Sequence, residues 1–262
     1  MKAEIAFIKL GGGLITDKNR PLSVKAGVIK RLAQEIREIQ VSYPALKLII
    51  GNGAGSFGHY YVRRYNLAGG ARSVKQIFGT GVVQHSVRQL NNLVTKQLLD
   101  AGVPAFSVSV ASMVTCAGGK ITKVFTDPIA GLLHLGAAPV VYGDLVTDTK
   151  KGAVVLSTEE IFALLIDELK TKYEIRTVIY AADVAGVLDK DGKVISHLST
   201  AAMADLKKAS GFDVTGGMQT KLAAALAAAR QAQRVYILGA NQRGNLLKAI
   251  AGQAVGTQVV AS

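Results

Sequence analysis

The stretch Gly51-Asn52-Gly53-Ala54-Gly55-Ser56-Phe57-Gly58-His59 follows the apolar run at 46–50, which predicts a buried parallel strand. Its four glycines and one alanine leave the backbone amides open to close approach by an anion. The residues after Ser56 are predicted to begin a helix, whose free N–H groups and dipole also favour negative charge. A histidine at the end of such a loop can hydrogen-bond a phosphate that binds there. The stretch therefore predicts a phosphate-acceptor site; a tight glycine turn between strand and helix is the simpler alternative.

Strand-like and helix-like segments alternate on both sides of this loop. The strand predicted at 5–10 ends in Gly11-Gly12-Gly13, and the predicted helix at 24–42 has apolar residues at helical spacing. This alternation predicts an α/β fold, a three-layer αβα sandwich with a mainly parallel central sheet. We expect a single domain over residues 1–262, with a lobe boundary near 143–150. Further helices are predicted at 82–101, 127–135, 158–170 and 218–233, further strands at 103–108, 138–142, 176–181 and 234–238, and hairpins around 117–120, 149–152 and 189–192.

Composition limits the class of protein. The chain has 262 residues, of which 49% are hydrophobic, enough for one large domain or two fused lobes with a substantial core. No apolar run of about 18 residues occurs and the N-terminus has no signal-peptide pattern, so we expect no membrane partner. The single cysteine, Cys116, excludes an internal disulfide. It fits a reducing compartment, which predicts a cytoplasmic protein in which Cys116 is a packing residue.

The formal net charge of +13 admits three explanations. Basic surfaces bind nucleic acids, but here the Lys and Arg residues are dispersed and the aromatic residues do not alternate with them. A protein that handles small phosphorylated molecules also needs positive charge. General surface solubility is the third explanation. We therefore expect a small phosphorylated substrate and no nucleic-acid partner.

Four loops rich in glycine or acidic residues follow predicted strands, and ligands of open α/β sheets bind where such loops meet. The first loop carries Lys9 and Gly11-Gly12-Gly13, and the second is the stretch at 51–59. Lys9 at the end of a buried strand needs a counter-ion, which a phosphate could supply, unless its side chain reaches solvent at a sheet edge. Neither loop has the spacing of a Walker A motif or of a dinucleotide fingerprint.

The third loop, Tyr142–Asp148, follows the strand predicted at 138–142. Its acidic residue Asp144 could orient a lysine or a metal ion. Acidic residues are also common at tight turns, so Asp144 could equally be a structural residue.

The fourth loop, at 180–187, carries Asp183 and is expected to lie beside the segment 213–221. Thr215 precedes a predicted helix whose first amides offer another anion site, although Thr215 can also be an ordinary N-cap. Lys221 lies one turn into that helix and can reach back to a phosphate.

The four loops together match one family pattern in order and spacing. The matching pieces are Lys9-Leu10-Gly11-Gly12 with Thr16-Asp17-Lys18, Gly55-Ser56-Phe57-Gly58-His59, Tyr142-Gly143-Asp144, Ala182-Asp183-Val184, and Asp213-Val214-Thr215-Gly216-Gly217-Met218 with Lys221. The chain thereby resembles the amino-acid kinase superfamily, and within it the isopentenyl phosphate kinases. The Ser-Phe-Gly-His ending is the narrowest signal, because amino-acid kinases that act on carboxylates differ there.

The resemblance implies transfer of the ATP γ-phosphate to isopentenyl phosphate, which gives isopentenyl diphosphate and ADP. It implies an acceptor-binding lobe at about 1–145, a nucleotide-binding lobe at about 146–262, and a homodimer. ATP and magnesium (Mg2+) are the implied cofactors. We expect phosphates to hold the magnesium, because no His, Cys or carboxylate spacing suggests a metal cage. Transfer to an existing phosphate needs no strong base, so positioning and charge neutralisation do most of the work.

The resemblance also implies roles for individual residues. Lys9 and Lys18 would hold the transferring phosphoryl group. His59 would hydrogen-bond the acceptor phosphate, and Asp144 would orient the lysines. The nucleotide would bind Lys9, Gly11, Gly12, Gly13, Gly55, Asp183, Gly216, Gly217 and Lys221. The acceptor phosphate would bind Ala54, Gly58, His59 and Gly143, and its apolar tail would lie against Val83, Val87 and Leu90, which could equally be core residues.

Three departures from the family pattern bear on the substrate. Asn52-Gly53-Ala54-Gly55 stands where His-Gly-Gly-Gly is usual, and Ala54 is tolerable there only if its φ is negative. Ser157-Thr158-Glu159 stands where Ser-Gly-Asp is usual, and Gly13 stands where a serine is common. A fosfomycin-kinase-like phosphonate kinase, with a polar and basic acceptor pocket, is therefore the alternative enzyme. A non-catalytic ligand-binding protein of the same fold is the other alternative.

Overall fold

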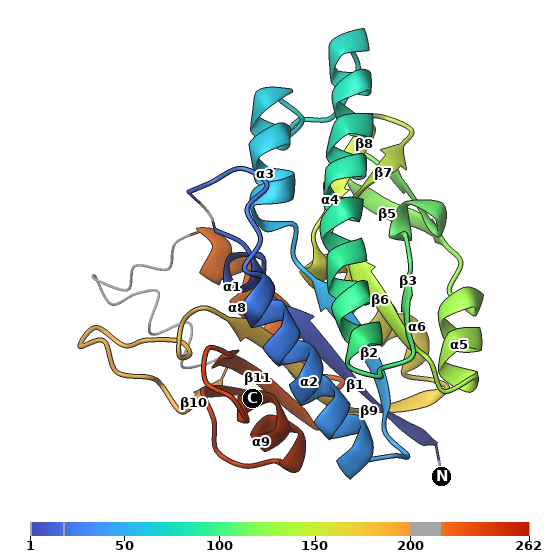
Figure 1. Ribbon diagram of the computed structural model, residues 1–262. Helices are drawn as coiled ribbons and strands as arrows, with labels where there is room; N and C mark the ends of the chain where they lie inside the picture. The colour runs from blue at the N-terminus through green and yellow to red at the C-terminus, as the bar shows by residue number, and fades with distance from the viewer. Residues whose placement is uncertain (1, 18, 200–215, 262) are drawn as a thin grey trace.

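The computed structural model describes residues 2–17, 19–199 and 216–261, and a large sheet forms its centre (Figure 1). The strands of this sheet are β1 (Ala3–Leu10), β2 (Lys47–Asn52), β3 (Ala105–Ser107), β6 (Ala138–Tyr142), β9 (Tyr173–Ala182), β10 (His197–Ser199), β11 (Arg234–Gly239) and β12 (Thr257–Val260). Their order is β10-β12-β11-β9-β1-β2-β6-β3. Neighbouring strands from β11 to β3 are parallel, whereas β12 is antiparallel to β11. The mainly parallel sheet predicted from the sequence is confirmed.

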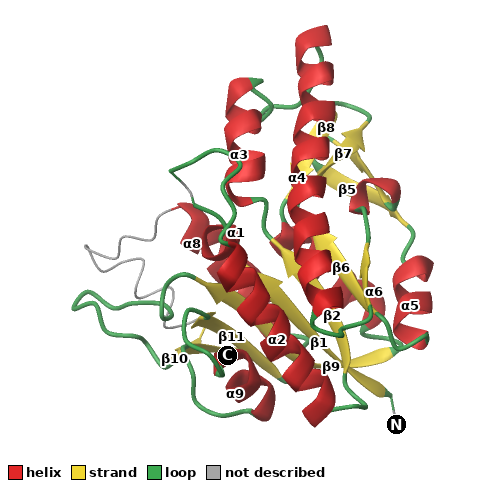
Figure 2. Cartoon of the chain, in the orientation of Figure 1, coloured by secondary structure: helices red, strands yellow, loops and turns green. Residues whose placement is uncertain are grey.

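Helices cover both faces of this sheet, as Figure 2 shows. The helices are α1 (Gly12–Ile15), α2 (Ala26–Ser42), α3 (Gly55–Arg64), α4 (Val74–Asp100), α5 (Asp127–His134), α6 (Thr158–Leu169), α8 (Gly216–Ala229) and α9 (Asn245–Ala251). Side chains of β1 alternate between two cores, because successive residues of a strand point to opposite faces. Phe7 packs in the core shared with α5, α6 and α8, and Ile8 in the core shared with α2, α4 and α9. The predicted three-layer αβα sandwich is therefore confirmed.

A second, smaller sheet lies above the main sheet in the view of Figure 1. Its strands are β4 (Val114–Ala117), β5 (Lys120–Val124), β7 (Asp144–Asp148) and β8 (Gly152–Leu156), in the order β5-β4-β7-β8. The pairs β4–β5 and β7–β8 are antiparallel, as the turn signals around 117–120 and 149–152 predict. This sheet carries one wall of the site described below.

Helix α4 begins at Val74, whereas the apolar spacing predicts a start at Val82. Ser73 and Gln76 form a capping box, in which the Gln76 N–H donates to the Ser73 hydroxyl and the Ser73 N–H donates to the Gln76 side chain. Gly79 lets the Tyr65 ring approach, since a Cβ at Gly79 would lie 2.4 Å from Tyr65 Cγ. The predicted start was wrong by about two turns. A capping box and an aromatic contact stabilise the start of α4, rather than a long stripe of buried apolar residues.

Two smaller sequence expectations concern the lone cysteine and membrane spans. Cys116 is fully buried in the core next to α5 and α6, as expected of a packing residue. Within the described part of the chain, no helix has both the length and the apolar character needed to cross a bilayer.

Candidate active site

A cavity of about 310 Å³ lies at the carboxyl ends of β1, β2, β6 and β9, and the structure brings the four predicted loops together around it. Parallel strands place their carboxyl ends at one edge of the sheet, which explains the convergence. The predicted site residues that line the cavity are Lys9, Gly11, Gly12, Gly13, Ala54, Gly55, Gly58, His59, Val83, Val87, Gly143, Asp144, Asp183 and Lys221. Gly216 and Gly217 are the first residues of α8, the helix that carries Lys221. The predicted phosphoryl-binding residue Lys18 lies outside the described residues, and so does Thr215.

The two glycine loops pack directly on each other. A Cβ at Gly12 would lie 2.5 Å from the Gly55 nitrogen, and a Cβ at Gly53 would lie 2.7 Å from the Gly12 nitrogen. A Cβ at Gly11 would lie 2.7 Å from the Ala181 carbonyl oxygen. Gly55 also has a φ of +49°, a conformation that glycine adopts without strain. These glycines are therefore required by loop packing as well as by any bound anion.

The amides expected to cradle the acceptor phosphate differ in whether they already have partners within the chain. The N–H of Gly58 donates to the Ala54 carbonyl at 3.3 Å, and that of Gly143 to the Asn52 carbonyl at 3.4 Å. The Ser56 N–H donates to the Thr16 hydroxyl at 3.1 Å. The described residues provide no hydrogen-bond acceptor for four other cavity-lining amides, which belong to Gly12, Gly13, Ala54 and Gly55.

These four amides lie where the two loops meet, at the N-terminal ends of α1 and α3. N-terminal amides and the helix dipole favour an anion at this position. Ala54 has a φ of −68° and a ψ of −26°, so its methyl group is compatible with the loop, as the sequence analysis requires. The anion site supported by the geometry is therefore centred on Gly12, Gly13, Ala54 and Gly55.

The counter-ion of Lys9 is a carboxylate that the sequence analysis did not identify. Lys9 Nζ lies 2.5 Å from Glu159 Oε1, and the two side chains are 4% and 12% exposed. Glu159 lies in the first turn of α6, which directly follows β8. The Ser157-Thr158-Glu159 departure placed an acidic residue after a predicted hairpin, and this was the signal that could have identified it. A buried lysine needs such a partner, because an unpaired charge in the interior is strongly unfavourable.

Asp144 has a different environment from the predicted one. Its carboxylate accepts the Ser109 hydroxyl at 3.0 Å and the Leu145 N–H at 2.9 Å. Burial raises the pKa of Asp144 above its ordinary value, although these hydrogen bonds and the charge of Arg88 oppose the rise. The residue that pairs with Lys9 in the structure is Glu159, and the orienting role that the resemblance implies for Asp144 stays a prediction.

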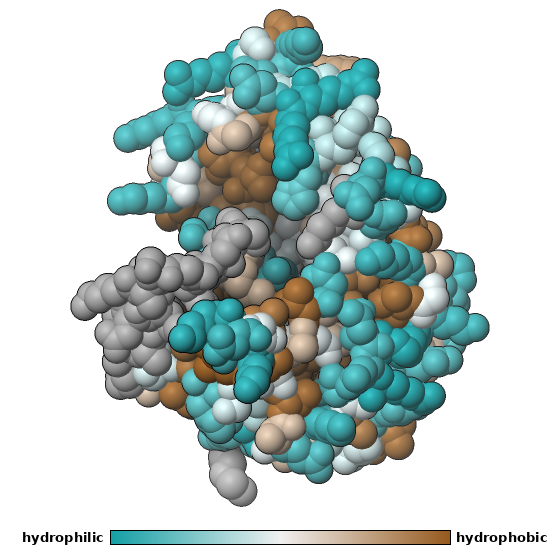
Figure 3. Space-filling model, turned by 90° about the vertical axis from the view of Figure 1, so that its left-hand side faces the viewer, coloured by the Kyte–Doolittle hydropathy of each residue, from teal (hydrophilic) through white to brown (hydrophobic). Residues whose placement is uncertain are grey.

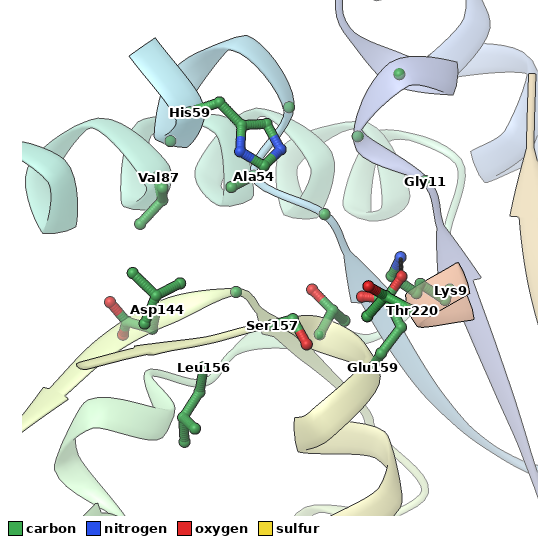
Figure 4. A pocket seen from close by; sticks show the side chains of 18 of the residues that line it. Lys9, Gly11, Ala54, His59, Val87, Asp144, Leu156, Ser157, Glu159 and Thr220 are labelled. Atoms are coloured by element: carbon green, nitrogen blue, oxygen red, sulfur yellow. Dashed lines mark hydrogen bonds and ion pairs between the residues drawn. The ribbon is translucent and has the colours of Figure 1, made fainter. Parts of the chain in front are cut away.

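The cavity has a polar side and an apolar side, which Figure 4 shows from close by. Lys9, Glu159 and Thr220 lie on one side, and Val87 and Leu156 lie towards the other, together with the carboxylate of Asp144. The apolar wall consists of Val62, Val83, Val87, Leu145, Val155 and Leu156. Leu90, the third predicted tail contact, belongs to the core beneath α2 and α9. An anionic head and an apolar tail can therefore bind in one cavity.

His59 projects from α3 over this cavity, next to Ala54 (Figure 4). His59 and the amides at the N-terminus of α3 both face the cavity, so an anion bound by those amides would lie near the imidazole. An imidazole nitrogen can donate a hydrogen bond to such an anion.

Comparison with known proteins identifies the family of this chain. The sequence model of the amino acid kinase family matches residues 4–239. The isopentenyl phosphate kinase of Methanocaldococcus jannaschii is 32% identical over 97% of this chain and 98% of its own length. That of Methanothermobacter thermautotrophicus is 30% identical over 97% of this chain and 98% of its own. A crystal structure of an isopentenyl phosphate kinase superimposes with a TM-score of 0.79 at 27% identity, covering 97% of this chain and 99% of that chain. The chain therefore belongs to the amino acid kinase family, in the group that contains the isopentenyl phosphate kinases.

Proposed function

We propose that this protein transfers the γ-phosphate of ATP to isopentenyl phosphate, producing isopentenyl diphosphate and ADP. The observation that carries the proposal is the two-sided cavity, in which Lys9 and amides without an acceptor among the described residues adjoin a wall of valine and leucine side chains. The full-length similarity to isopentenyl phosphate kinases supports the same reaction.

In this proposal the acceptor phosphate lies at the amides of Ala54 and Gly55, with His59 donating to one of its oxygens. The amides of Gly12 and Gly13 and the ammonium group of Lys9 stabilise the transferring phosphoryl group. Lys221 contacts the nucleotide phosphates, and Asp183 lies along the nucleotide. The acceptor oxygen is already an anion, so holding the reactants in line and neutralising their charge accounts for most of the rate.

Glu159 positions Lys9 in this reaction. Its carboxylate neutralises the ammonium group, and a bound phosphoryl group would offer Lys9 a second anion. Lys18, also proposed to hold that group, lies outside the described residues.

Magnesium is proposed to enter with the nucleotide, where it would neutralise phosphate charge. The described residues contain no group of three or more His, Cys, Asp or Glu side chains that could hold a metal ion. Magnesium at nucleotides is usually bound mainly by phosphates and water, so the proposed role needs no protein cage.

The apolar wall also bears on the alternative enzyme. A fosfomycin-like phosphonate needs a polar and basic acceptor pocket, whereas valine and leucine residues form the apolar wall here, beside His59 and Asp144. The test is to incubate the protein with Mg-ATP and isopentenyl phosphate, fosfomycin or N-acetylglutamate, and to follow ADP release. We expect rapid turnover with isopentenyl phosphate alone. Preferential turnover of either other acceptor would refute the proposal.

A homodimer is proposed as the assembled state. The edge strand β3 carries Phe106, which is half exposed, and Leu93 and Leu99 are exposed on the neighbouring helix α4. Burying this surface against a second copy would remove apolar area from water. Sedimentation should give the mass of a dimer for the unmodified chain and of a monomer for Phe106→Asp. The cytoplasmic location predicted from the sequence stays a proposal.

A further inference from the structure

The N-terminal end of α4 projects from the molecule at the top of the view in Figure 1, with Tyr65 as its aromatic contact: the Tyr65 and Phe78 ring centroids are 6.2 Å apart. Three large apolar side chains lie on this helical tip: Val74, Ile77 and Phe78, which are 86%, 58% and 67% exposed. Their spacing of three and four residues places them on one face of the helix. Such exposure of neighbouring apolar side chains is unfavourable in water and marks an interaction surface.

The sequence on either side of this tip contains only basic residues among its charged residues. No Asp or Glu occurs in the sequence between Glu38 and Asp100, a range that contains all of α3 and nearly all of α4. Arg63 and Arg64 end α3, and Arg72 and Lys75 flank the start of α4. All four side chains are exposed. Figure 3 shows apolar side chains at the top of the molecule, where this tip lies, with hydrophilic side chains beside them.

We propose that this surface, the α4 tip, docks on an anionic lipid membrane without crossing it, which replaces the sequence-based expectation of no membrane partner. The α4 tip is defined as Val74, Ile77 and Phe78 together with Arg63, Arg64, Arg72 and Lys75. Apolar side chains that enter the boundary between headgroups and acyl chains, with basic side chains against anionic headgroups, are the features of interfacial helices. A second copy of the chain is a poor occupant, because a two-fold contact would bring the same arginines and lysines face to face.

The α4 tip lies close to the cavity, so docking on a membrane would affect access of an amphiphilic substrate. The cavity-lining residues Val83 and Val87 lie further along the same helix, in the turns that follow the tip. A protein docked through the tip would therefore hold the apolar side of its cavity close to the lipid surface. Lipid binding itself does not depend on the proposed reaction and can be measured without turnover.

The first test compares sedimentation of the protein with vesicles of phosphatidylcholine alone and of phosphatidylcholine mixed with phosphatidylglycerol. We expect binding to the mixed vesicles only. The double variant Ile77→Ser with Phe78→Ser should lose about tenfold in lipid partitioning. The matched control, Val41→Ser with Leu135→Ser, removes exposed apolar side chains elsewhere and should bind like the unmodified protein.

A second pair of variants tests the charges. Arg63→Gln with Arg64→Gln should weaken binding to the mixed vesicles about tenfold or more, since each basic residue near an anionic surface contributes about fivefold. Lys190→Gln with Lys193→Gln removes two exposed charges from a distant loop and should have little effect.

Four results would overturn the proposal. They are absence of binding, equal binding to neutral vesicles, equal loss in the control variants, and full binding by the Ile77→Ser and Phe78→Ser variant. If the Ile77→Ser and Phe78→Ser variant had a lower assembly mass than the unmodified protein in the absence of lipid, the surface would be assigned to contact with a second copy instead. Unchanged turnover of isopentenyl phosphate by the variant would show that its loss of binding does not come from misfolding.

Discussion

Single residues decide how charge is handled in the cavity, and Lys9 is the clearest case. Its position at the end of a buried strand predicts that it needs a counter-ion, and the structure provides Glu159. The same ammonium group is proposed to hold a phosphoryl group during turnover. The stabilisation of Lys9 by the Glu159 carboxylate and by a bound phosphate can therefore be distinguished by measuring protein stability with and without nucleotide.

Glu159→Ala is expected to lower the stability of the ligand-free protein by about 3 kcal/mol, because Lys9 is left buried without a partner. Adding ATP should recover much of this loss, since nucleotide phosphate would replace the carboxylate. Thermal unfolding with and without ATP measures both effects. The neighbouring variant Glu160→Ala breaks the capping box of α6, so it should cost about 1 kcal/mol in both conditions. Equal losses for Glu159→Ala with and without ATP would contradict the replacement.

His59→Ala is expected to lower kcat for isopentenyl phosphate by on the order of a hundredfold, as loss of one charge-stabilising donor does. His85→Ala is the matched control, because His85 is an exposed histidine of α4 that does not line the cavity. Steady-state kinetics of both variants provide the measurement. Normal turnover by His59→Ala would remove the imidazole from the mechanism.

At the scale of elements, Asp148 joins the two hairpins of the smaller sheet. Its carboxylate accepts the N–H groups of Gly118 and Gly119 in one turn and of Lys150 and Lys151 in the other. These backbone hydrogen bonds hold the pKa of Asp148 well below its ordinary value, despite the burial of the side chain. The strands β7 and β8 lead from this junction to the apolar wall of the cavity.

The depressed pKa of Asp148 predicts a pH dependence of stability. The ionised carboxylate stabilises the fold above the pKa of the unfolded chain, about 4, and this contribution is lost as the pH falls towards the folded-state value. Asp148→Asn should therefore melt several degrees below the unmodified protein at neutral pH, and the difference should shrink in acid. Melting temperatures of both proteins between neutral and acid pH provide the measurement. A difference in melting temperature that stays constant with pH would contradict the role of the ionised carboxylate.

Over the whole molecule, the net charge of +13 should raise the rate at which anionic substrates reach the cavity. Added salt screens this field, so kcat/KM for isopentenyl phosphate is expected to fall severalfold with ionic strength while kcat changes little. Steady-state kinetics in increasing potassium chloride measure the effect, and sucrose of equal osmolality serves as the control. A kcat/KM that is independent of salt would leave general solubility as the explanation of the charge.

Most of the fold follows from local pattern. The strand at 5–10, the helix at 24–42 and the hairpins around 117–120 and 149–152 lie where apolar spacing and turn residues predict them. The start of α4 was missed because it depends on a cap and on the contact between Gly79 and Tyr65. The division into an acceptor lobe and a nucleotide lobe stays a prediction; the main sheet runs without interruption from β11 to β3.

By itself, the sequence determined that loops carrying glycine, lysine and acidic residues follow parallel strands, and thus that they meet at one edge of a sheet. It also determined the apolar spacing on α4 that lines the cavity. Only the tertiary structure decided that Lys9 pairs with Glu159 and that Asp144 contacts Ser109. It also decided which loop amides find an acceptor within the described part of the chain. Local pattern specifies elements through neighbours in the chain, whereas these contacts join residues far apart in sequence, whose distances exist only after the elements have packed.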